Sequence, residues 1–584
     1  MNKSPILRIL LLLALMVSAL VHAAERPNVI LIMTDDQGYG DYGVKGNKFI
    51  NTPNFDAMAS RSASMSTFYV NPVCSPTRAS LMTGRYNLRT RCIDTWIGHS
   101  MMEPEEVTVA EVLRDAGYAT GIFGKWHLGD SYPMRAIDQG FDEALVLRGG
   151  GLAQPADHPE NDNRYTDPWL YHNGVPVKTK GYCTDVYFTA AMKYIKQQKK
   201  AKKPFFTYIA TNAPHGPFHD VPEDLREKYM KMPLEELNQT KLEGDAATKN
   251  RDRMARIFAM VENTDQNIGR LFDFLEKQGL TENTLVIYMD DNGPNTARYV
   301  GSFRGMKSEV VEGGIRSPMW LHWPSKFKAG TTRDTLTANI DVMPTILDVC
   351  DVPIPEKLRL DGRSFLPVLK DANTEWAERT IVMQSHRGPA ASRYNNFMIR
   401  NNRYKLVHPS GFGNHTFEGD PKFELYDLLK DPGETNNLIA KQPLVATLLK
   451  GSYDVWFDDV SSTRENNYAP PIIQAGTPHE NPTSLTRQDW LGTSWGPDTT
   501  DGYWNINFPE EHTYDLTVHL YPKEKAGNIT LNIAHATYTR FIPEGAKTLV
   551  INNVQIPSGQ HKISGAVTHG KKLTAPYQIE LLRQ

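Results

Sequence analysis

The sequence predicts an α/β protein in which helices sandwich a mostly parallel or mixed sheet, followed by a smaller α+β C-terminal subdomain and a terminal β-sandwich. Two observations predict the first unit: unbroken apolar runs of strand length, and longer segments of helical periodicity that alternate with them. The third observation is a strict alternation of apolar and polar residues near the carboxyl end, which is typical of antiparallel strands in a sandwich.

In the first unit, strands are predicted at 28–33, 118–123, 205–210 and 285–289, and helices at 109–116, 187–198 and 254–278. Thr108 and Glu111 have the spacing of a capping box at the start of the first helix, and Gly117 ends it. Polar residues follow all four strands: Asp35 and Asp36, Lys125 and His127, His215, and Asp291 and Asn292. Because ligands collect beyond the carboxyl ends of strands in such sheets, we expect these side chains to form one site.

The domain boundaries follow from changes in pattern. We expect the α/β domain at 25–380, the smaller subdomain at 381–465, and a linker with an accessory β-sandwich at 466–584. The stretch 466–486 is rich in Pro, Asn and Thr and is interpreted as a linker or long loop. Alternation at 513–520 and 529–533 predicts two sandwich strands. Four aromatic residues of this domain either pack in its core or form a sugar-binding face: Trp490, Trp495, Tyr503 and Trp504.

Residues 1–24 have the order of a secretory signal peptide: basic residues, an apolar run, then small residues. The alternative is a single membrane anchor, but the run is shorter than the ~20 residues that a spanning helix needs. We therefore expect an exported protein, periplasmic or secreted, with no transmembrane anchor. The net charge of -3 provides no broad basic field for nucleic acid. Four cysteines make no disulfide framework, although a single Cys92–Cys183 bridge is left open.

Two acidic pairs indicate a metal site. Asp35 and Asp36 leave a buried strand side by side, and like charges so close are costly unless a cation neutralises them. Asp291 and Asn292 leave another strand in the same way, and carboxylate and amide oxygens favour a hard ion such as calcium or magnesium. The alternative is that the pairs only begin helices or turns. A shifted register, with Asp290 as the ligand, is also left open.

Cys74 begins a segment, Cys74-Ser-Pro-Thr-Arg78, that continues through Leu81-Met-Thr-Gly-Arg85. The segment is predicted to be a helix with Cys74 at its amino end, where backbone dipoles favour anions. It resembles the signature of type I sulfatases, Cys-x-Pro-Ser/Thr-Arg followed by Leu-x-Thr-Gly-Arg, a family of the alkaline-phosphatase-like superfamily. Further similar segments are Asp35-Asp36-Gln-Gly-Tyr-Gly40, Gly124-Lys-Trp-His127-Leu-Gly129, Ala213-Pro-His215, Asp291-Asn-Gly293 and Arg304-Gly-Met-Lys307. The resemblance covers about residues 26 to 450, and Met306 departs from the Gly often found there.

The resemblance implies a sulfuric ester hydrolase whose Cys74 is oxidised to formylglycine by a separate maturation enzyme. It implies one calcium ion held by Asp35, Asp36, Asp291, Asn292 and the group at position 74. Arg78, Lys125 and Lys307 would supply positive charge to the sulfate, and Arg78 could also pair with Asp35. Asp291 would take a proton from the aldehyde hydrate that attacks sulfur, and His215 with Lys307 would protonate or stabilise the departing alkoxide. His127 would remove the second hydroxyl proton so that sulfate leaves.

Three other functions are kept open. A phosphate or phosphonate ester hydrolase would share the sheet, but such enzymes generally want transition metals and more histidine ligands. A small aryl-sulfate hydrolase fits the motifs as well as an enzyme acting on a sulfated polysaccharide or oligosaccharide, which export and the sandwich favour. A glycan-binding protein would use the sandwich alone. Candidate residues for substrate recognition are Arg148, His158, Arg164, Trp169, Ser385, His386 and Arg387.

Overall fold

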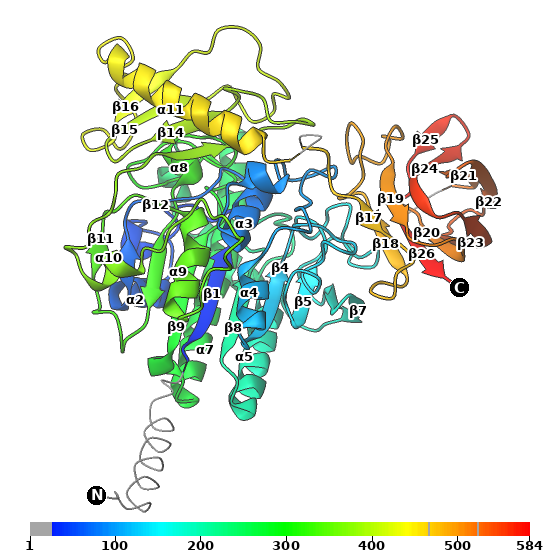
Figure 1. Cartoon of the computed structure of the whole chain (residues 1–584), viewed down its shortest axis with the longest axis horizontal. Helices are drawn as coiled ribbons and strands as arrows, with labels where there is room; N and C mark the ends of the chain where they lie inside the picture. The colour runs from blue at the N-terminus through cyan, green and yellow to red at the C-terminus, as the bar shows by residue number, and fades with distance from the viewer. Residues whose placement is uncertain (1–25, 465–467, 522–524) are drawn as a thin grey trace, which may run out of the picture.

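The computed structural model describes residues 26–464, 468–521 and 525–584 (Figure 1). The signal peptide expected at 1–24 lies outside the described residues. Within the described ranges, no helix combines the length and the apolar character needed to cross a membrane.

A ten-stranded mixed sheet forms the centre of the molecule, in the order β11-β2-β10-β9-β1-β8-β4-β5-β6-β7. Its middle is parallel and consists of β9 (Thr284–Asp290), β1 (Asn28–Thr34), β8 (Phe205–Ala210), β4 (Ala119–Lys125) and β5 (Glu143–Leu147). The outer strands are β11 (Thr332–Arg333), β2 (Ala63–Met65), β10 (Met319–His322), β6 (Trp169–His172) and β7 (Val175–Lys178). The sheet therefore confirms the predicted class, since the four predicted strands occupy its parallel middle.

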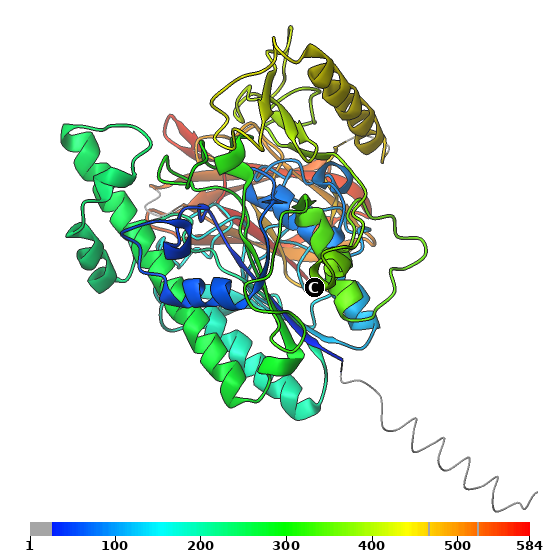
Figure 2. The ribbon, with the colours of Figure 1, turned by 90° about the vertical axis from the view of Figure 1, so that its left-hand side faces the viewer.

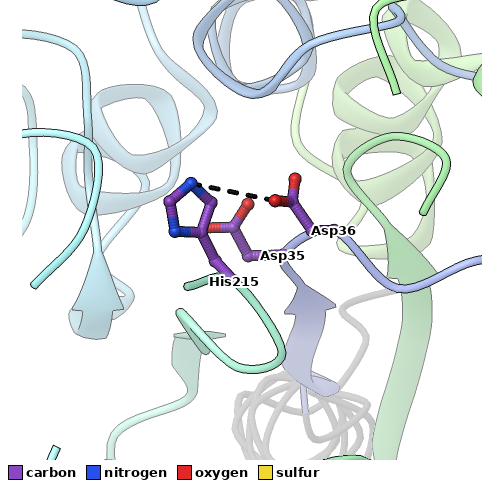
Figure 3. A group of neighbouring side chains, drawn as sticks. All are labelled: Asp35, Asp36 and His215. Atoms are coloured by element: carbon purple, nitrogen blue, oxygen red, sulfur yellow. Dashed lines mark ion pairs between the residues drawn. The ribbon is translucent and has the colours of Figure 1, made fainter. Parts of the chain in front are cut away.

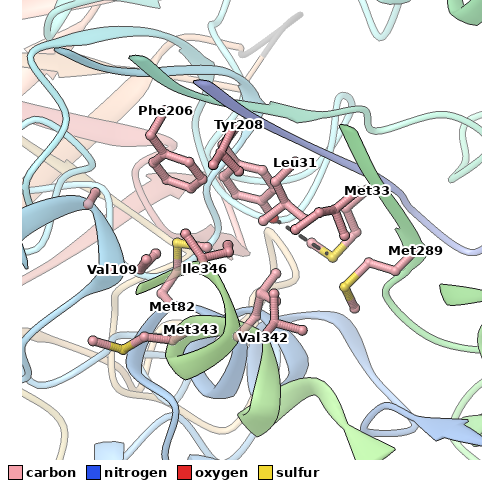
Figure 4. Close-up of a cluster of buried hydrophobic side chains, with 14 of the residues drawn as sticks. Leu31, Met33, Met82, Val109, Phe206, Tyr208, Met289, Val342, Met343 and Ile346 are labelled. Carbon is pink, nitrogen blue, oxygen red and sulfur yellow. Dashed lines mark hydrogen bonds between the residues drawn. The ribbon is translucent and has the colours of Figure 1, made fainter. Parts of the chain in front are cut away.

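The two faces of the sheet bury different hydrophobic clusters because side chains alternate along each strand. Ile30 and Ile32 of β1 pack in the cluster on the face covered by α2 (Pro53–Arg61), α5 (Cys183–Ala201) and α7 (Gly244–Lys277), and the last two helices lie side by side (Figure 2). Leu31 and Met33 point to the other face. Figure 4 shows that cluster, which includes side chains of α3 (Cys74–Thr83), α4 (Val109–Asp115) and α9 (Val342–Val349). Burial on both faces explains why β1 has no polar residue between Asn28 and Thr34.

The three predicted helices are present: α4 ends one residue before the predicted 116, whereas α5 extends beyond 187–198 at both ends. The capping box of α4 is confirmed. The hydroxyl oxygen of Thr108 accepts a hydrogen bond from the backbone amide of Glu111, and the Glu111 carboxylate accepts one from the backbone amide of Thr108. Helix α7 begins ten residues before the predicted 254, at Gly244, where its residues are polar and exposed and give no apolar period. The remaining helices are α6 (Glu223–Met230), α8 (Glu312–Ile315), α10 (Leu366–Lys370) and α11 (Pro443–Ser461).

The smaller subdomain is a four-stranded antiparallel sheet covered by α11. Its strands are β13 (Ile381–Gln384), β14 (Phe397–Arg400), β15 (Tyr404–His408) and β16 (Glu424–Asp427). A buried ion pair connects it to the large domain: Lys405 lies 3.0 Å from Glu312, and it also lies 2.8 Å from Glu434 of its own subdomain. Two short strands, β3 (Phe68–Tyr69) and β12 (Thr337–Ala338), form a small parallel pair.

The terminal domain packs two sheets on each other. One contains β17 (Ile473–Gln474), β19 (Trp504–Phe508), β24 (Gly559–His569), β21 (Gly527–Ile533) and β22 (Ala536–Ile542), with β25 (Lys572–Thr574) beside β24. The other contains β18 (Thr483–Thr486), β26 (Gln578–Arg583), β20 (His512–His519) and β23 (Thr548–Ile556). As predicted, the alternating residues Tyr514, Leu516 and Val518 are fully buried between them.

One expectation for this region needs correction. The stretch 466–486, interpreted as a linker or long loop, contributes β17 and β18 to the sandwich, because Ile473 and Leu485 are apolar enough to join its core. Trp490 and Trp504 are also core residues with no exposed surface, so neither can form a sugar-binding face.

The four cysteines are all buried and free, so the bridge left open between Cys92 and Cys183 is not formed. The Cys92 thiol donates to the carbonyl of Ser100, and the Cys183 thiol lies 3.7 Å from the side-chain oxygen of Asn212.

Candidate active site

The carboxyl ends of β1, β4, β8 and β9 deliver the predicted polar residues to one edge of the sheet. Asp35 and Asp36 leave β1, which is hydrogen-bonded to β8 on one side and β9 on the other. Lys125 ends β4, and His215 lies in the turn after β8. The amide of Asp291, just after β9, donates to the carbonyl of Thr34 at the end of β1. The sheet register therefore holds these side chains together.

Cys74 is the first residue of α3 and is only 2% exposed. Its sulfur and one oxygen each of Asp35 and Asp291 lie within 4.8 Å of one another. Burial raises the pKa of the thiol, and Asp35 and Asp291 act in the same direction, although Lys125 and Lys307 oppose them. Helix α3 is fixed to β9 by Thr77, whose hydroxyl donates to the carbonyl of Asp291 at 2.7 Å.

Acidic side chains gather beside Cys74. Asp35, Asp36 and His215 form a second group whose ligand atoms lie within 4.8 Å of one another (Figure 3). The Asp36 amide donates to the Asp291 carboxylate at 3.1 Å, and the side-chain amide of Asn292 donates to Asp36 at 2.9 Å. Burial raises the pKa of Asp291, and repulsion from Asp35 adds to that effect. Such crowding of carboxylates is expected where a cation is bound.

This donor set fits a hard metal ion. One oxygen of Asp35 and the side-chain oxygen of Asn292 are buried, and neither has a hydrogen-bond partner among the described residues. Buried oxygens without a donor are costly, and a cation would satisfy both. Oxygen donors favour calcium or magnesium over zinc. The cluster is therefore a candidate metal site formed by Asp35, Asp36, Asp291 and Asn292.

The surroundings of Asp290 bear on which of the two neighbouring carboxylates could be a ligand. One of its oxygens accepts from three hydroxyls, those of Thr34 at 2.8 Å, Tyr288 at 3.0 Å and Tyr42. Burial raises the pKa of Asp290 to about 8. Consecutive residues of an extended strand face opposite ways, so Asp290 turns toward these tyrosines while Asp291 turns toward Arg78. Asp291 is therefore the better candidate ligand.

Three basic side chains neutralise the carboxylates. Lys125 lies 2.6 Å from Asp35, and Arg78 lies 2.8 Å from Asp291. Arg78 is also 4.0 Å from Asp35, so the pairing considered for it is present beside a closer one. Lys307 pairs with Asp36, and although burial alone would raise the pKa of Asp36, Lys307 and His215 hold it well below its usual range.

Two histidines lie near this group. The Nε2 atom of His127 is 2.9 Å from the carbonyl oxygen of Thr95, while its Nδ1 atom is buried without a partner among the described residues. The Nδ1 atom of His215 lies 2.7 Å from the carbonyl of Gly216, and its Nε2 atom lies 3.7 Å from Asp36. Burial lowers the pKa of both imidazoles, that of His215 to about 4.

The consecutive glycines Gly149, Gly150 and Gly151 lie beside the site, and two of them approach the histidines closely. A Cβ atom on Gly150 would lie 2.6 Å from the Cε1 atom of His127, and one on Gly151 would lie 3.1 Å from the Nδ1 atom of His215. His127 itself has a left-handed backbone, as does Asp36. Backbone conformations of this kind are retained where function requires them.

Sequence reasoning missed several residues near the site. Thr95 and Gln488 contact His127, but neither lies in a motif or at a strand end. A sequence pattern could have indicated Gly149, Gly150 and Gly151, since three consecutive glycines are typical of a close approach of backbone to another group. Asp94 pairs with Arg387 at 2.6 Å, which brings one recognition candidate beside Thr95.

The other recognition candidates lie in different surroundings. Arg148 stacks on Tyr171, 3.9 Å from the ring centre, and with His158 it lines a groove of about 380 Å³ between the large domain and the sandwich. Trp169 stacks on His158, and Arg164 is exposed, 4.0 Å from Asp220. Ser385 and His386 are buried, and their side chains accept from or donate to nearby backbone groups.

Comparison with known proteins identifies the family. Residues 27–352 match the family model "Sulfatase", and residues 306–450 match "N-sulphoglucosamine sulphohydrolase, C-terminal". The chain is 31% identical over 388 residues to the N-acetylgalactosamine-6-sulfatase of Canis lupus familiaris, covering 62% of this chain and 69% of that protein. It is 27% identical over 495 residues to the N-acetylglucosamine-6-O-sulfatase of Bacteroides thetaiotaomicron, covering 71% and 83%.

Solved structures agree with this assignment. The crystal structure of Ps i-CgsB in complex with k-i-k-neocarrahexaose has a TM-score of 0.63 and 26% identity, over 74% of this chain and 92% of that chain. The phosphonate monoester hydrolase of Agrobacterium radiobacter, at 20% identity and a TM-score of 0.52, shares the fold alone. With more than half of its residues matched by the family model, the chain belongs to the type I sulfatase family and is a sulfuric ester hydrolase.

Proposed function

We propose that this protein is an exported sulfatase that removes sulfate from a sulfated polysaccharide or oligosaccharide, with an aldehyde hydrate derived from Cys74 as the nucleophile. The observation that carries the proposal is the position of Cys74, at the amino end of α3 and within 4.8 Å of ligand oxygens of Asp35 and Asp291. A separate maturation enzyme would supply the oxidation. The export part rests on the signal-peptide pattern of residues 1–24.

A calcium ion held by Asp35, Asp36, Asp291, Asn292 and the group at position 74 would supply positive charge where the sulfate oxygens bind. Lys125, Lys307 and Arg78 add to that charge. They are fixed by ion pairs with Asp35, Asp36 and Asp291, so they need no rearrangement as negative charge develops. The site is thus suited to an anionic ester.

Proton transfers are assigned to three residues. Asp291 would accept the proton of the attacking hydroxyl, a role favoured by burial and by Asp35, which raise its pKa. His215 and Lys307 face the departing oxygen; an anionic ester beside His215 favours its charged form, which can donate a proton from Nε2. His127 presents its free Nδ1 lone pair and would take the proton that must leave before sulfate is released.

The carbohydrate part of the proposal has two supports. The two relatives described above are named for sulfated amino sugars, and Ps i-CgsB was solved with an oligosaccharide. The Arg387 guanidinium is stacked 4.1 Å from the ring centre of Trp96 and 4.7 Å from that of Phe412. Trp96 in turn contacts Trp495 of the sandwich edge to face. A partly exposed arginine held between rings is suited to polar groups of a sugar.

Replacement of the nucleophile tests the core of the proposal. Cys74→Ala should abolish turnover of an aryl sulfate, because alanine cannot be converted to an aldehyde. Mass spectrometry of the peptide containing residue 74 should find an aldehyde in the wild type when it is produced with a maturation enzyme. The wild type should turn over aryl sulfate faster than aryl phosphate. Undiminished turnover by Cys74→Ala would contradict the mechanism.

Metal binding should depend on Asp291 rather than on its neighbour. We expect Asp291→Asn to lose calcium in elemental analysis and to lose most activity, because a charged ligand is removed. Asp290→Asn is the matched control: burial raises the pKa of Asp290, so an amide replaces a carboxyl that is largely protonated at neutral pH. Equal calcium content in the two variants, or tightly bound zinc in the wild type, would count against the site.

Substrate class can be tested with Arg387. Arg387→Ala should lower kcat/KM for a sulfated oligosaccharide by about 10-fold or more, since a hydrogen bond to a charged group contributes about 1.5–3 kcal/mol. Turnover of a small aryl sulfate should change much less. Arg540→Ala, on exposed strand β22, is the control. Equal losses on both substrates would mean that Arg387 does not recognise the sugar.

The close approach of Gly150 to His127 gives a steric test. Gly150→Ala should reduce kcat by about 10- to 100-fold, because its methyl group would displace the His127 ring and small misplacements of catalytic groups are costly. Gly451→Ala, in helix α11 with no atom within 4 Å of the added methyl, should leave kcat unchanged. Wild-type kcat in Gly150→Ala would show that the ring has room to move.

A further inference from the structure

The terminal sandwich is joined to the active-site domain by the residues that follow β18. The amide of Gly98 donates to the carbonyl of Gln488 at 2.9 Å, and the amide of Asp130 donates to the Asp489 carboxylate at 2.8 Å. Ile97, Met101 and Met134 of the large domain belong to the hydrophobic core of the sandwich. The two domains therefore share a core here, and the segment around Gln488 is held firmly.

The side chain of Gln488 reaches the surroundings of His127. It is 1% exposed, and its Nε2 atom donates to the carbonyl oxygen of Thr95 at 2.8 Å and to the hydroxyl oxygen of Ser100 at 2.7 Å. The same Thr95 oxygen lies 2.9 Å from the Nε2 atom of His127. The two side-chain nitrogens are 3.2 Å apart because they share this acceptor.

The shared Thr95 carbonyl determines which nitrogen of His127 carries a hydrogen and which way the Gln488 amide faces. A carbonyl oxygen only accepts, so the Nε2 atom of His127 must carry its hydrogen toward Thr95. A flipped Gln488 amide would bring its oxygen against the Thr95 oxygen, so the amide nitrogen must also face it. The two hydrogens of that nitrogen are used by Thr95 and Ser100. Neutral His127 therefore keeps its lone pair on Nδ1, the buried atom without a partner among the described residues.

We propose that Gln488 is a positioning residue for desulfation: it holds the Thr95 carbonyl that sets the tautomer and orientation of His127, and the terminal sandwich thereby completes the active site. This rests on the role proposed above for His127. Gln488 lies beyond residue 450, where the matches to both family models have ended. The sandwich is in this respect part of the catalytic unit rather than an accessory.

The test replaces Gln488 in the full-length, matured enzyme. Gln488→Leu removes the donors at similar volume and should lower kcat for an aryl sulfate by about 10- to 100-fold. KM should fall in parallel and kcat/KM should stay within about twofold, because only the step after the alcohol has left is slowed. Gln578→Leu is the matched control: this glutamine is also buried in the sandwich, 2% exposed, and should keep wild-type kcat. Thermal unfolding should be similar for both variants.

A rapid-mixing measurement separates positioning from general damage. Since His127 acts after the alcohol has left, Gln488→Leu should release about one equivalent of phenol rapidly and then turn over slowly. Gln488→Glu keeps the side-chain length, but its carboxylate cannot donate to the Thr95 carbonyl. We therefore expect the same rapid phenol release and slow turnover as for Gln488→Leu. This variant tests the proposal if the leucine variant does not fold.

Wild-type kcat in either variant, or a slow step without the initial release, would overturn the proposal. Failure of the proposed function is distinguishable, because it would appear as a wild type without sulfatase turnover or as an active Cys74→Ala.

Discussion

The structure depends on holding three carboxyl groups together in a place that water hardly reaches. Asp35, Asp36 and Asp291 are almost completely buried, and each is paired with one base, Lys125, Lys307 or Arg78. Removing charges from water is expensive unless partners are close and well oriented. Since these residues come from β1, β4, β9, α3 and a later loop, the pairs exist only when the sheet is in register and α3 is docked. Fold and reactive site are thus stabilised by the same contacts.

The parts of the fold and site that sequence could predict are those with a local cause. The strands around 28–33 and 285–289 were readable because both faces are buried, and Asp35 and Asp291 were readable because they end those strands. Helix α7 was predicted too short, because its first turns contact little apolar surface. Thr95 and Gln488 could not be found, since Thr95 acts through its backbone carbonyl and Gln488 reaches it from hundreds of residues away along the chain, and neither contact leaves a local pattern.

The sandwich changes how the chain is divided. Its sequence alone favoured an independent module joined by a linker, yet β17 and β18 arise from the supposed linker. Trp490 and Trp504 face inward, in the core-packing role that was one of their two expected roles. The core that encloses these rings also encloses Ile97 and Met101, which flank the turn beside His127. A cluster of apolar side chains that crosses the domain boundary makes relative movement of the two domains costly. The turn at residues 95–100, whose Thr95 carbonyl lies beside His127, is consequently held by packing from both domains.

Helix α3 has one more consequence, for the order of events during biosynthesis. All ten of its residues are buried, including Cys74 and Arg78. A thiol that is 2% exposed in the folded protein is hard for the catalytic groups of another protein to reach, and burial also raises its pKa, which disfavours the reactive thiolate. The proposed oxidation of Cys74 therefore has to happen while this segment is still an extended nascent peptide. The nucleophile of the mature enzyme would thus be formed before the chain folds.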